Sequence, residues 1–591
     1  MKQYMADFET TTNPMDCRVW AYAICDIDDP EEVIIGNDLD DFLEWCSEQT
    51  GSPRIFFHNL GFDLSFIIDR LFKLGFKHTT EKEDRKSRTF NTMISDKGIV
   101  YQCEIIFYRK GKNTRKVILR DSLKLIPMKV RDIPKAFGLE QAKGEIDYKL
   151  HDSLPAGSPI SEEEQEYIKG DVQIVAKALK FMFEHGMTKM TIGACALDQY
   201  KQTIGKRTFD RWYPTPEYHN DVKQSYRGGF TYLNPKFAGV IVKNGVTLDV
   251  NSLYPSVMRN PDNAFPFGTP IFFQGQYQYD PLYPIYTQML SCQFELKPNK
   301  IPTIQIKHSL IFTGNEYLTS SNGEEVTLCL NSVDLELFFE QYNVYNPVYH
   351  SGWKFKASSG MFDKYIDKWT EAKIKATQEG NKGMRTIAKL MLNSCYGKFG
   401  QDIKNINKVP YLTEDGEVKY YLSEAKPKKG LYIAMASFIT SYARRVTITS
   451  AQKVTDDYNA GKSNIQFIYA DTDSLHLSSP DFKLPEGLEI DPYKLGAWKF
   501  ESKFSDYGQK DGCGAKFLRQ KCYIENLTED VNNPDTKDYR LKITVAGMPD
   551  TCYNQVTFDN FKIGATYTGK KLPQVVSGGT VLMDATFTIK K

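Results

Sequence analysis

Acidic residues placed beside apolar, strand-like segments constrain this chain more than any other feature of its sequence. They fall in two series that lie far apart among its 591 residues. The first series is Asp7, Glu9, Asp63 and Asp171, and the second is Asp249, Asp471 and Asp473. Carboxylates brought close together repel one another unless cations neutralise them. The sequence therefore predicts two separate carboxylate sites, carried by a chain long enough for several domains.

The first series belongs to a region, residues 1–190, in which strand-like and helical segments alternate as in an α/β unit. Asp7 and Glu9 are two residues apart, so a strand would place both side chains on one face. Asp63 follows the strand-like run at 55–58, near the start of a helix. Hard oxygen ligands of this kind suit Mg²⁺ or Mn²⁺.

A helical segment over 162–183 supplies the rest of this set. Tyr167 and Asp171 are four residues apart and would share one face of that helix. Two divalent cations held by such carboxylates can activate water and stabilise the leaving oxygen in phosphodiester hydrolysis. Tyr167 would hold the attacking water or the scissile phosphate, so the first set predicts a nuclease site.

The second series is split between two distant segments. Val246 to Val250 is a strand-like run, and Asp249 lies at its end. Asp471 and Asp473 lie in a turn between two apolar runs that predict a hairpin. An isolated D-x-D in a turn is most often ordinary Asx-turn chemistry. Paired with an acid at a strand end, it predicts a second site for two cations.

A helical stretch over 360–399 lies between these segments and carries cations at a regular spacing. Arg385, Lys389 and Asn393 recur every four residues, so one helix face presents all three. Two cations one turn apart can bind a triphosphate, although a solvated basic face has the same spacing. Tyr396-Gly397, next along the helix, would let a flat base pair approach closely.

Charge and cysteine usage narrow the class of protein. The formal net charge of +1 hides basic stretches at 107–135, with ten Lys/Arg against two acids, and at 354–404, with eleven against five. Such stretches suit a polyanion track, although each alone is more often a solvated surface. Eleven cysteines without a C-x-x-C pair argue against zinc and disulfides and fit a reducing cytosol. The apolar run at 430–443 is too short to span a bilayer and predicts a buried helix.

Turn signals mark the segments between these motifs. Asn322-Gly323 predicts a hairpin turn among short strands within 301–351. Asp415-Gly416 predicts a second turn after the helical stretch, and the C-terminal segment is rich in strand and turn signals. We therefore expect small β units in addition to the two carboxylate-bearing domains.

The ordered motifs together resemble a known enzyme family. D-x-E, N-x-x-F-D and Y-x-x-x-D, in this order, are similar to the proofreading exonucleases with a ribonuclease-H-like fold. Asp249 to Pro255, Lys389 to Gly397 and Tyr469 to Ser474 resemble the three polymerase motifs of family B DNA polymerases. The likeness covers nearly the whole chain and is greatest to the protein-primed, strand-displacing replicative polymerases of Bacillus podophages. It implies a template-directed DNA polymerase that replicates a viral genome and has an intrinsic 3′→5′ exonuclease.

The resemblance also implies an α/β (α+β) multidomain fold. A ribonuclease-H-like exonuclease domain would precede a right-hand polymerase with palm, fingers and thumb and two insertions. The expected domains are the exonuclease at 1–190, the palm at 191–260 and 428–545, an insertion contacting the priming protein at 261–359, the fingers at 360–398, an insertion for processivity and strand displacement at 399–427, and the thumb at 546–591.

Residue roles follow from the motif positions. The polymerase cations would be held by Asp249, Val250 and Asp473, with Asp471 completing or orienting the set, and the exonuclease cations by Asp7, Glu9, Asp63 and Asp171. The nucleotide would contact Tyr254, Lys373, Arg385, Lys389 and Asn393. DNA would contact Thr10, Asn59, Phe62, Ser122, Leu123 and Lys143 in the exonuclease domain, and Tyr226, Gly228, Gly229, Ser252, Tyr396, Gly397, Lys521 and Tyr523 in the polymerase. Arg385 departs from the family, whose members more often carry Lys there.

The implied chemistry is phosphoryl transfer with two divalent cations, Mg²⁺ or Mn²⁺, in each site. Tyr254 would lie under the sugar and collide with a 2′-hydroxyl, which favours deoxynucleotides. The implied partners are template and primer DNA, deoxynucleoside triphosphates and a terminal protein that primes synthesis. The chain would act as a monomer in the cytoplasm of the bacterial host.

Three alternatives remain open on the sequence. A reverse transcriptase or RNA polymerase is disfavoured by Tyr254 and by the D-T-D spacing, because reverse transcriptases typically pair adjacent aspartates. A catalytically dead DNA-binding replication factor would be expected to lose some carboxylates, and all seven are present. A nuclease alone leaves the second half of the chain unexplained.

Overall fold

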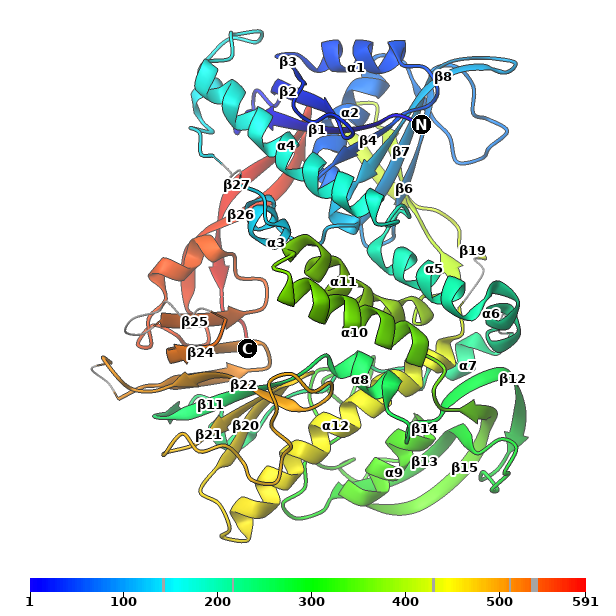
Figure 1. Ribbon diagram of the computed structural model, residues 1–591, viewed down its shortest axis with the longest axis vertical. Helices are drawn as coiled ribbons and strands as arrows, with labels where there is room; N and C mark the ends of the chain where they lie inside the picture. Colours follow the sequence, from blue (N-terminus) through cyan, green and yellow to red (C-terminus); the bar gives the residue numbers. More distant parts are fainter. Residues whose placement is uncertain (141–143, 215–216, 428–430, 510–511, 533–539) are drawn as a thin grey trace.

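Two large β-sheets lie at opposite ends of the molecule, with helices between them (Figure 1). The computed structural model describes residues 1–591 apart from 141–143, 215–216, 428–430, 510–511 and 533–539. The predicted DNA contact Lys143 lies outside the described residues. No helix within the described ranges is long and apolar enough to cross a membrane.

The N-terminal sheet has eight strands in the order β3-β2-β1-β4-β8-β7-β6-β5. Their bounds are β1 (Gln3–Thr10), β2 (Val19–Asp26), β3 (Val33–Gly36), β4 (Arg54–Phe57), β5 (Lys77–His78), β6 (Thr89–Ile94), β7 (Val100–Lys110) and β8 (Asn113–Asp121). β1 pairs in parallel with β4 and β4 in parallel with β8, whereas β2 runs antiparallel to β1. The α/β unit expected from the sequence is therefore present.

Helices cover both faces of this sheet. α1 (Leu39–Glu48) and α2 (Leu60–Lys73) pack on one face, and α4 (Glu162–Glu184) packs on the other. Along β1, Tyr4, Ala6 and Phe8 enter the core under α1 and α2, whereas Met5 enters the core under α4. Because strand side chains alternate, the acids that follow Met5 at two-residue spacing face α4.

The helical stretch expected over 360–399 is present and consists of two helices. α10 (Asp363–Gln378) and α11 (Lys382–Phe399) pack against each other between the two sheets (Figure 1). Gly380 has a φ of +68°, which the right-handed helix does not allow, and the Asn381 side chain caps α11 by accepting from the Met384 N–H. α5 (Ile192–Ile204) packs on α11, and α6 (Lys206–Trp212) and α7 (His219–Lys223) follow it.

The second large sheet lies at the other end of the molecule and is almost entirely antiparallel. It consists of β10 (Ile241–Val242), β23 (Ala515–Arg519), β24 (Cys522–Asp530), β22 (Trp498–Phe504), β11 (Gly245–Val250), β21 (Ser474–Ser478), β20 (Gln466–Asp471) and β9 (Thr231–Leu233) in this order, with β25 (Arg540–Val545) paired to β24. The hairpin predicted around the D-T-D turn is confirmed as β20–β21.

A long buried helix supports the second sheet. α12 (Ile433–Asn459) shares one hydrophobic core with Leu248 and Val250 of β11 and packs on the short α8 (Leu253–Arg259). The buried helix predicted over 430–443 is thus confirmed, although Gly430 lies outside the described residues and the helix continues to Asn459. Because Leu248 and Val250 point into this core, Asp249 between them points to the opposite face of the sheet.

Two smaller β units are inserted around this sheet. The first has β12 (Phe265–Gln274), β13 (Ile285–Leu296), β14 (Val326–Asn331) and β15 (Tyr342–Ser358) in the order β12-β15-β13-β14, with α9 (Ser332–Gln341). The Asn322-Gly323 turn forms, with positive φ at both residues. The expectation of a hairpin there is wrong, because β14 pairs with the distant β13.

The second insertion lies against the N-terminal domain. It comprises β16 (Lys404–Asn405), β17 (Lys408–Leu412), β18 (Val418–Leu422) and β19 (Lys426–Pro427). The hairpin predicted at Asp415-Gly416 is confirmed, because β17 and β18 are antiparallel and Gly416 has a φ of +78°. Asn407 forms a bridge with Ser95, and Val418 packs against the core of the N-terminal sheet.

The C-terminal hairpin reaches the same domain from another side. β26 (Thr566–Val576) and β27 (Gly579–Thr588) form a two-stranded antiparallel ribbon that runs up to α2 (Figure 1). At its tip the Lys73 ammonium donates to the Ser577 hydroxyl over 3.2 Å. A Cβ on Gly578 would lie 2.2 Å from the Cys17 carbonyl oxygen, so only glycine permits this contact. Both insertion and ribbon therefore tie the second half of the chain to the first.

Candidate active sites

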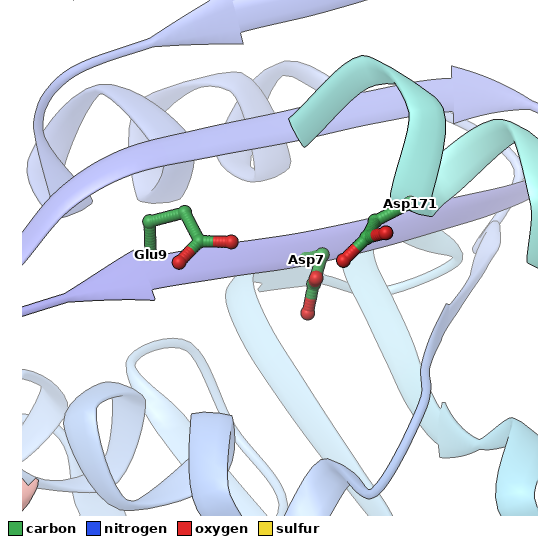
Figure 2. Close-up of side chains that lie close together, drawn as sticks. All are labelled: Asp7, Glu9 and Asp171. Atoms are coloured by element: carbon green, nitrogen blue, oxygen red, sulfur yellow. The ribbon is translucent and has the colours of Figure 1, made fainter. Parts of the chain in front are cut away.

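Three acids of the first series meet between β1 and α4. Oxygen atoms of Asp7, Glu9 and Asp171 all lie within 4.8 Å of one another, and their side chains turn toward a common point (Figure 2). Glu9 and Asp171 are buried, at 8% and 4% exposure. A set of hard oxygen donors at this spacing fits a divalent cation, because such cations take carboxylate ligands and offset the repulsion among them.

Local sequence explains why the helix delivers its residues there. α4 begins at a capping box in which the Ser161 hydroxyl accepts from the Glu164 N–H and the Glu164 carboxylate accepts from the Ser161 N–H. This fixed start sets the helix rotation, and Tyr167 and Asp171 then point into the site one turn apart. Both are buried.

Asp63 on α2 lies near enough for the charges of Asp7 and Glu9 to act on it, outside the group of three whose oxygens lie within 4.8 Å. It lies in the first turn of that helix and is 3% exposed. Burial, together with the charge of Asp7, raises its pKa well above the usual range. Asn59 precedes the helix in a left-handed conformation with φ +75°, and its N–H donates to Asp121 Oδ1 over 3.0 Å. Asp121 was not expected from the sequence, and it holds the start of α2 in place.

A second tyrosine, which was not predicted from the sequence, reaches this site. The hydroxyl groups of Tyr148 and Tyr167 share a hydrogen bond of 2.9 Å. Burial and the charge of Asp171 raise the pKa of Tyr167, so its phenol stays protonated. Tyr148 lies in a segment without regular periodicity, so only the folded position of that segment identifies it.

The acids of the second series meet on the second sheet. Asp249 near the end of β11 has Ser474 as its register partner, and the Val250 N–H donates to the Asp473 carbonyl over 2.7 Å. A cavity of about 500 Å³ is lined by Asp249, Asp473, Asp471 and Glu501, among other residues. Strand pairing thus brings together residues that are far apart in the chain.

The turn that carries Asp473 is tightly held. Thr472 has a φ of +60°, and its N–H donates to the Phe230 carbonyl over 2.6 Å. A Cβ on Gly229 would lie 2.5 Å from Thr472 Oγ1. Gly229 is therefore required for the close approach of its loop to the D-T-D turn.

Electrostatic repulsion in this site favours a cation. Burial, and then the charges of Asp473 and Glu501, raise the pKa of Asp249 to about 8. Burial also raises the pKa of Asp473. Glu501, on β22 at a bulge opposite Thr247 and Leu248, was missed by the sequence analysis. In the sequence, Glu501 is marked only by its place in a strand-like run, two residues after Lys499. Asp249, Asp473 and Glu501 line one cavity, although among the described residues only the first set brings three ligand oxygens within 4.8 Å of one another.

Asp471 has a different environment from the other two aspartates. The Lys521 ammonium lies 2.8 Å from both of its carboxylate oxygens, and the Thr231 hydroxyl donates to Oδ1 over 3.1 Å. The Tyr469 hydroxyl donates to Oδ2 over 3.3 Å. The side chain of Asp471 therefore holds Lys521. The sequence left open whether Asp471 completes or orients the cation set, and this contact favours the orienting role.

Aromatic and cationic side chains face the second site from the helices. Tyr254 at the start of α8 stacks on Tyr396 of α11, with ring centroids 4.0 Å apart and planes 19° apart. Burial, and then the charges of Arg385 and Lys389, lower the pKa of Lys373. The three cations from α10 and α11 therefore lie near enough for their charges to interact, and their contact with a nucleotide stays a prediction. Asn393 is exposed on the same helix.

Comparison with known proteins identifies the chain. The family described as DNA polymerase type B, organellar and viral, matches residues 50–156 and 155–486. The DNA polymerase of Bacillus phage phi29 is 43% identical over 100% of this chain and 99% of its own length, and that of Streptococcus phage Cp-1 is 31% identical over 100% and 98%. The structure of phi29 DNA polymerase with primer-template DNA and incoming nucleotides superposes with a TM-score of 0.90 over the whole of both chains, at 42% identity.

The chain belongs to the type B DNA polymerases. It is a DNA-directed DNA polymerase with a 3′→5′ exonuclease domain, and the expected likeness to the protein-primed, strand-displacing phage enzymes is confirmed. The solved phi29 complexes include one with single-stranded DNA, which this chain matches with a TM-score of 0.89. Enzymes of this family use divalent cations, and the cluster of Asp7, Glu9 and Asp171 fits such an ion.

The predicted DNA contacts of the exonuclease domain differ in accessibility. Thr10 ends β1 beside the acids, and Phe62 lies in α2 against Phe66. Ser122 is fully buried, with its hydroxyl donating to the Phe57 carbonyl over 3.0 Å. The Leu123 N–H donates to the same Asp121 oxygen as Asn59 does. Their contacts with DNA stay predictions.

The predicted DNA contacts of the polymerase domain also divide into two kinds. Around Gly397 no atom lies within 4 Å of where a Cβ would be, which leaves room for a base pair. The Gly228 carbonyl accepts from Arg444 Nη1 over 2.7 Å, and Ser252 adopts a φ of +55° before α8. Tyr523 is 5% exposed and stacks on Phe517 at 5.1 Å, so in this structure it packs in the core. Tyr226 lies against Gly400.

Proposed function

We propose that this polymerase extends a primed DNA template at the Asp249–Asp473 site and removes mispaired 3′ ends at the Asp7–Glu9–Asp171 site, with Mg²⁺ serving both. The observation that carries the proposal is the pair of separate carboxylate sets on two different sheets. The acids of each set are buried or half-buried, and a divalent cation would relieve the repulsion among them.

In the polymerase site, Asp249 and Asp473 would hold the cations and Glu501 would help to position them. Bound there, Mg²⁺ ions lower the pKa of the primer 3′-hydroxyl and stabilise charge on the departing pyrophosphate. Val250 contributes through its backbone, which fixes Asp473 against β11. Asp471 would act through Lys521, which it orients toward the primer end.

The nucleotide would enter between α11 and the sheet. Lys373, Arg385 and Lys389 would bind its triphosphate by charge-assisted hydrogen bonds. The stacked pair of Tyr254 and Tyr396 forms a flat platform, on which Tyr254 would lie under the sugar and exclude a 2′-hydroxyl. Asn393 is on the same helix as the two cations and would line the approach.

In the exonuclease site, the four acids would hold the cations that make a water molecule nucleophilic. Tyr167 stays protonated and would donate a hydrogen bond to that water or to the scissile phosphate, oriented by Tyr148. A mispaired end frays more easily than a paired one, so it would reach this site more often. Thr10, Asn59, Phe62 and Leu123 would grip the unpaired strand, with Ser122 supporting Leu123 from the core.

The second insertion would let the enzyme displace a strand. It lies against the exonuclease domain, and a cavity of about 720 Å³ at their junction is lined by Tyr101, Lys124, Lys398 and Lys404, among others. We propose that the template passes here while its complement is excluded. The proposed division of the chain follows the expected domains, with the exonuclease boundary near 190 falling between α4 and α5.

The likeness to phage polymerases also supports a terminal protein as natural primer, held by the insertion at 261–359. We infer that the chain acts as a monomer in the cytoplasm of an infected bacterium, because the similar proteins belong to bacteriophages.

A primed single-stranded DNA circle with Mg²⁺ and the four deoxynucleotides tests the proposal. We expect products many times longer than the circle, which requires both synthesis and unaided displacement. Products that stop at one circumference would keep the polymerase and remove the displacement role of 399–427. A primer that is shortened and never extended would leave only the exonuclease half standing.

A further inference from the structure

One lysine outside the expected triphosphate set lies beside the polymerase acids. Lys499 on β22 is the direct register partner of Asp249 on β11. Residues opposite each other in an antiparallel pair point to the same face of the sheet. Leu248 and Val250, on either side of Asp249, enter the core under α12. Lys499 therefore shares with Asp249 the face that carries the catalytic acids.

This lysine also belongs to the cluster of cations from the helices. After burial, the charges of Arg385, Lys389 and Lys499 lower the pKa of Lys373. The cluster thus joins two fingers helices to a strand of the second sheet. None of the ion pairs formed within the described ranges includes any of these four side chains. Like charges collected in one place destabilise a fold unless anions join them.

We propose that Lys499 is a further ligand of the incoming nucleotide, binding a non-transferred phosphate from the side of the sheet while the helix cations bind from the other. The inference rests on the proposed polymerase function and adds to it a residue of the triphosphate site. Because the same phosphates leave as pyrophosphate, Lys499 would also bind that product.

A second role is compatible with the register but predicts different kinetics. Lys499 could serve only as a counter-ion of Asp249, whose pKa its charge lowers. Its loss would then weaken cation binding and reduce kcat at saturating nucleotide. A phosphate ligand binds both the nucleotide and pyrophosphate. Its loss therefore raises the KM for the nucleotide and the inhibition constant for pyrophosphate.

The test compares Lys499→Met, which keeps the stem and removes the charge, with Lys499→Arg. Lys503→Met is the matched control, because Lys503 lies on the same strand and pairs with Glu529 at 2.7 Å. Single-nucleotide extension of a primer–template gives KM and kcat, and added pyrophosphate gives its inhibition constant. Degradation of single-stranded DNA by each variant reports on the fold of the exonuclease domain.

For Lys499→Met we expect KM and the pyrophosphate inhibition constant both to rise by about 10-fold or more, the usual effect of losing one charge-assisted hydrogen bond. Lys499→Arg should recover most of the loss, and Lys503→Met should match the unaltered enzyme. An unchanged KM with a reduced kcat, or a raised Mg²⁺ requirement alone, would overturn the proposal in favour of the counter-ion. Failure of the unaltered enzyme to extend any primer would instead refute the polymerase function itself.

Discussion

The two carboxylate sites of this polymerase differ in what surrounds their acids. In the exonuclease site, oxygen atoms of Asp7, Glu9 and Asp171 lie within 4.8 Å of one another, and the charges of Glu9 and Asp171 act on Tyr167, which shares a hydrogen bond with Tyr148. In the polymerase site, lysines alternate with the acids: Lys521 pairs with Asp471, and Lys499 lies opposite Asp249.

The lysines of the polymerase site suit the charge of its substrate. A phosphodiester brings one negative charge to a hydrolytic site. A deoxynucleoside triphosphate brings several more, which need fixed cations as well. The comparison shows that the acids of the polymerase site lie among lysines that can bind the additional phosphates of a triphosphate.

The largest expected effect comes from replacing Asp473, which belongs to the polymerase site alone. Asp473→Asn should reduce primer extension on the order of 1,000-fold or more, because it removes a cation ligand that acts with Asp249 as a unit. Degradation of single-stranded DNA should stay unchanged, since the exonuclease acids lie on another sheet. Loss of both activities would contradict the division into two independent sites.

The reciprocal change is Asp7→Ala in the exonuclease site. We expect loss of single-stranded DNA degradation by roughly three orders of magnitude, with extension of a matched primer retained. The measurement follows shortening of a labelled oligonucleotide in Mg²⁺ without nucleotides. Undiminished degradation by this variant would show that the cluster around Asp7 is not the hydrolytic site.

A smaller effect should come from the segment that positions Tyr148. The His151 ring stacks on Trp20 at 3.7 Å with planes 3° apart, and His151 shares a 3.0 Å hydrogen bond with Glu164 of the α4 capping box. His151→Ala should lower exonuclease kcat by about 10-fold, as loss of an outer partner of a catalytic group commonly does.

His185→Ala is the control for that variant, because His185 lies exposed at the C-terminal end of α4. Polymerase activity of both variants should equal that of the unaltered enzyme. If His151→Ala also left the exonuclease unchanged, the contact between Tyr148 and Tyr167 would not depend on this stack.

The smallest effect concerns stability without metal. The pKa of Asp249 is raised from 3.8 to about 8, so the folded protein binds a proton that the unfolded chain releases between these values. Stability contributed by this proton is present at low pH and is lost as pH rises from about 4 toward 8. With a chelator present, the Tm of the Asp249→Asn variant should therefore be about 2 °C above that of the unaltered protein at pH 8.5. The difference should be smaller at pH 5.5.

Mg²⁺ should raise the Tm of the unaltered protein at pH 8.5 and change that of Asp249→Asn little, because the cation replaces the proton in offsetting Asp473 and Glu501. An advantage of Asp249→Asn that does not grow with pH would show that Asp249 is not under repulsion in the metal-free site.

Several features could be predicted because they are local. The alternation of β1 places Asp7 and Glu9 on one face, four-residue spacing places Tyr167 with Asp171, and Asp415-Gly416 makes a tight turn. Each depends on backbone geometry within a few residues. The helical stretch expected over 360–399 is divided at Gly380, whose left-handed backbone conformation interrupts it.

Other features depend on contacts between distant segments. Glu501 and Lys499 reach the polymerase acids only because β22 pairs with β11, and the bulge between them turns Glu501 into the cavity. Tyr148 reaches Tyr167 only because its segment folds back over α4. The pairing of β14 with β13 likewise overrode the hairpin suggested by Asn322-Gly323.

By itself, the sequence determined the two carboxylate sets, the family and the helix cations, because these motifs are short and their periodicities are set by the backbone. Only the tertiary structure decided which lysines lie beside the acids of the polymerase site, with Lys521 at Asp471 and Lys499 opposite Asp249. That choice depends on strand register across the sheet, where one residue of slip moves a charge to the opposite face.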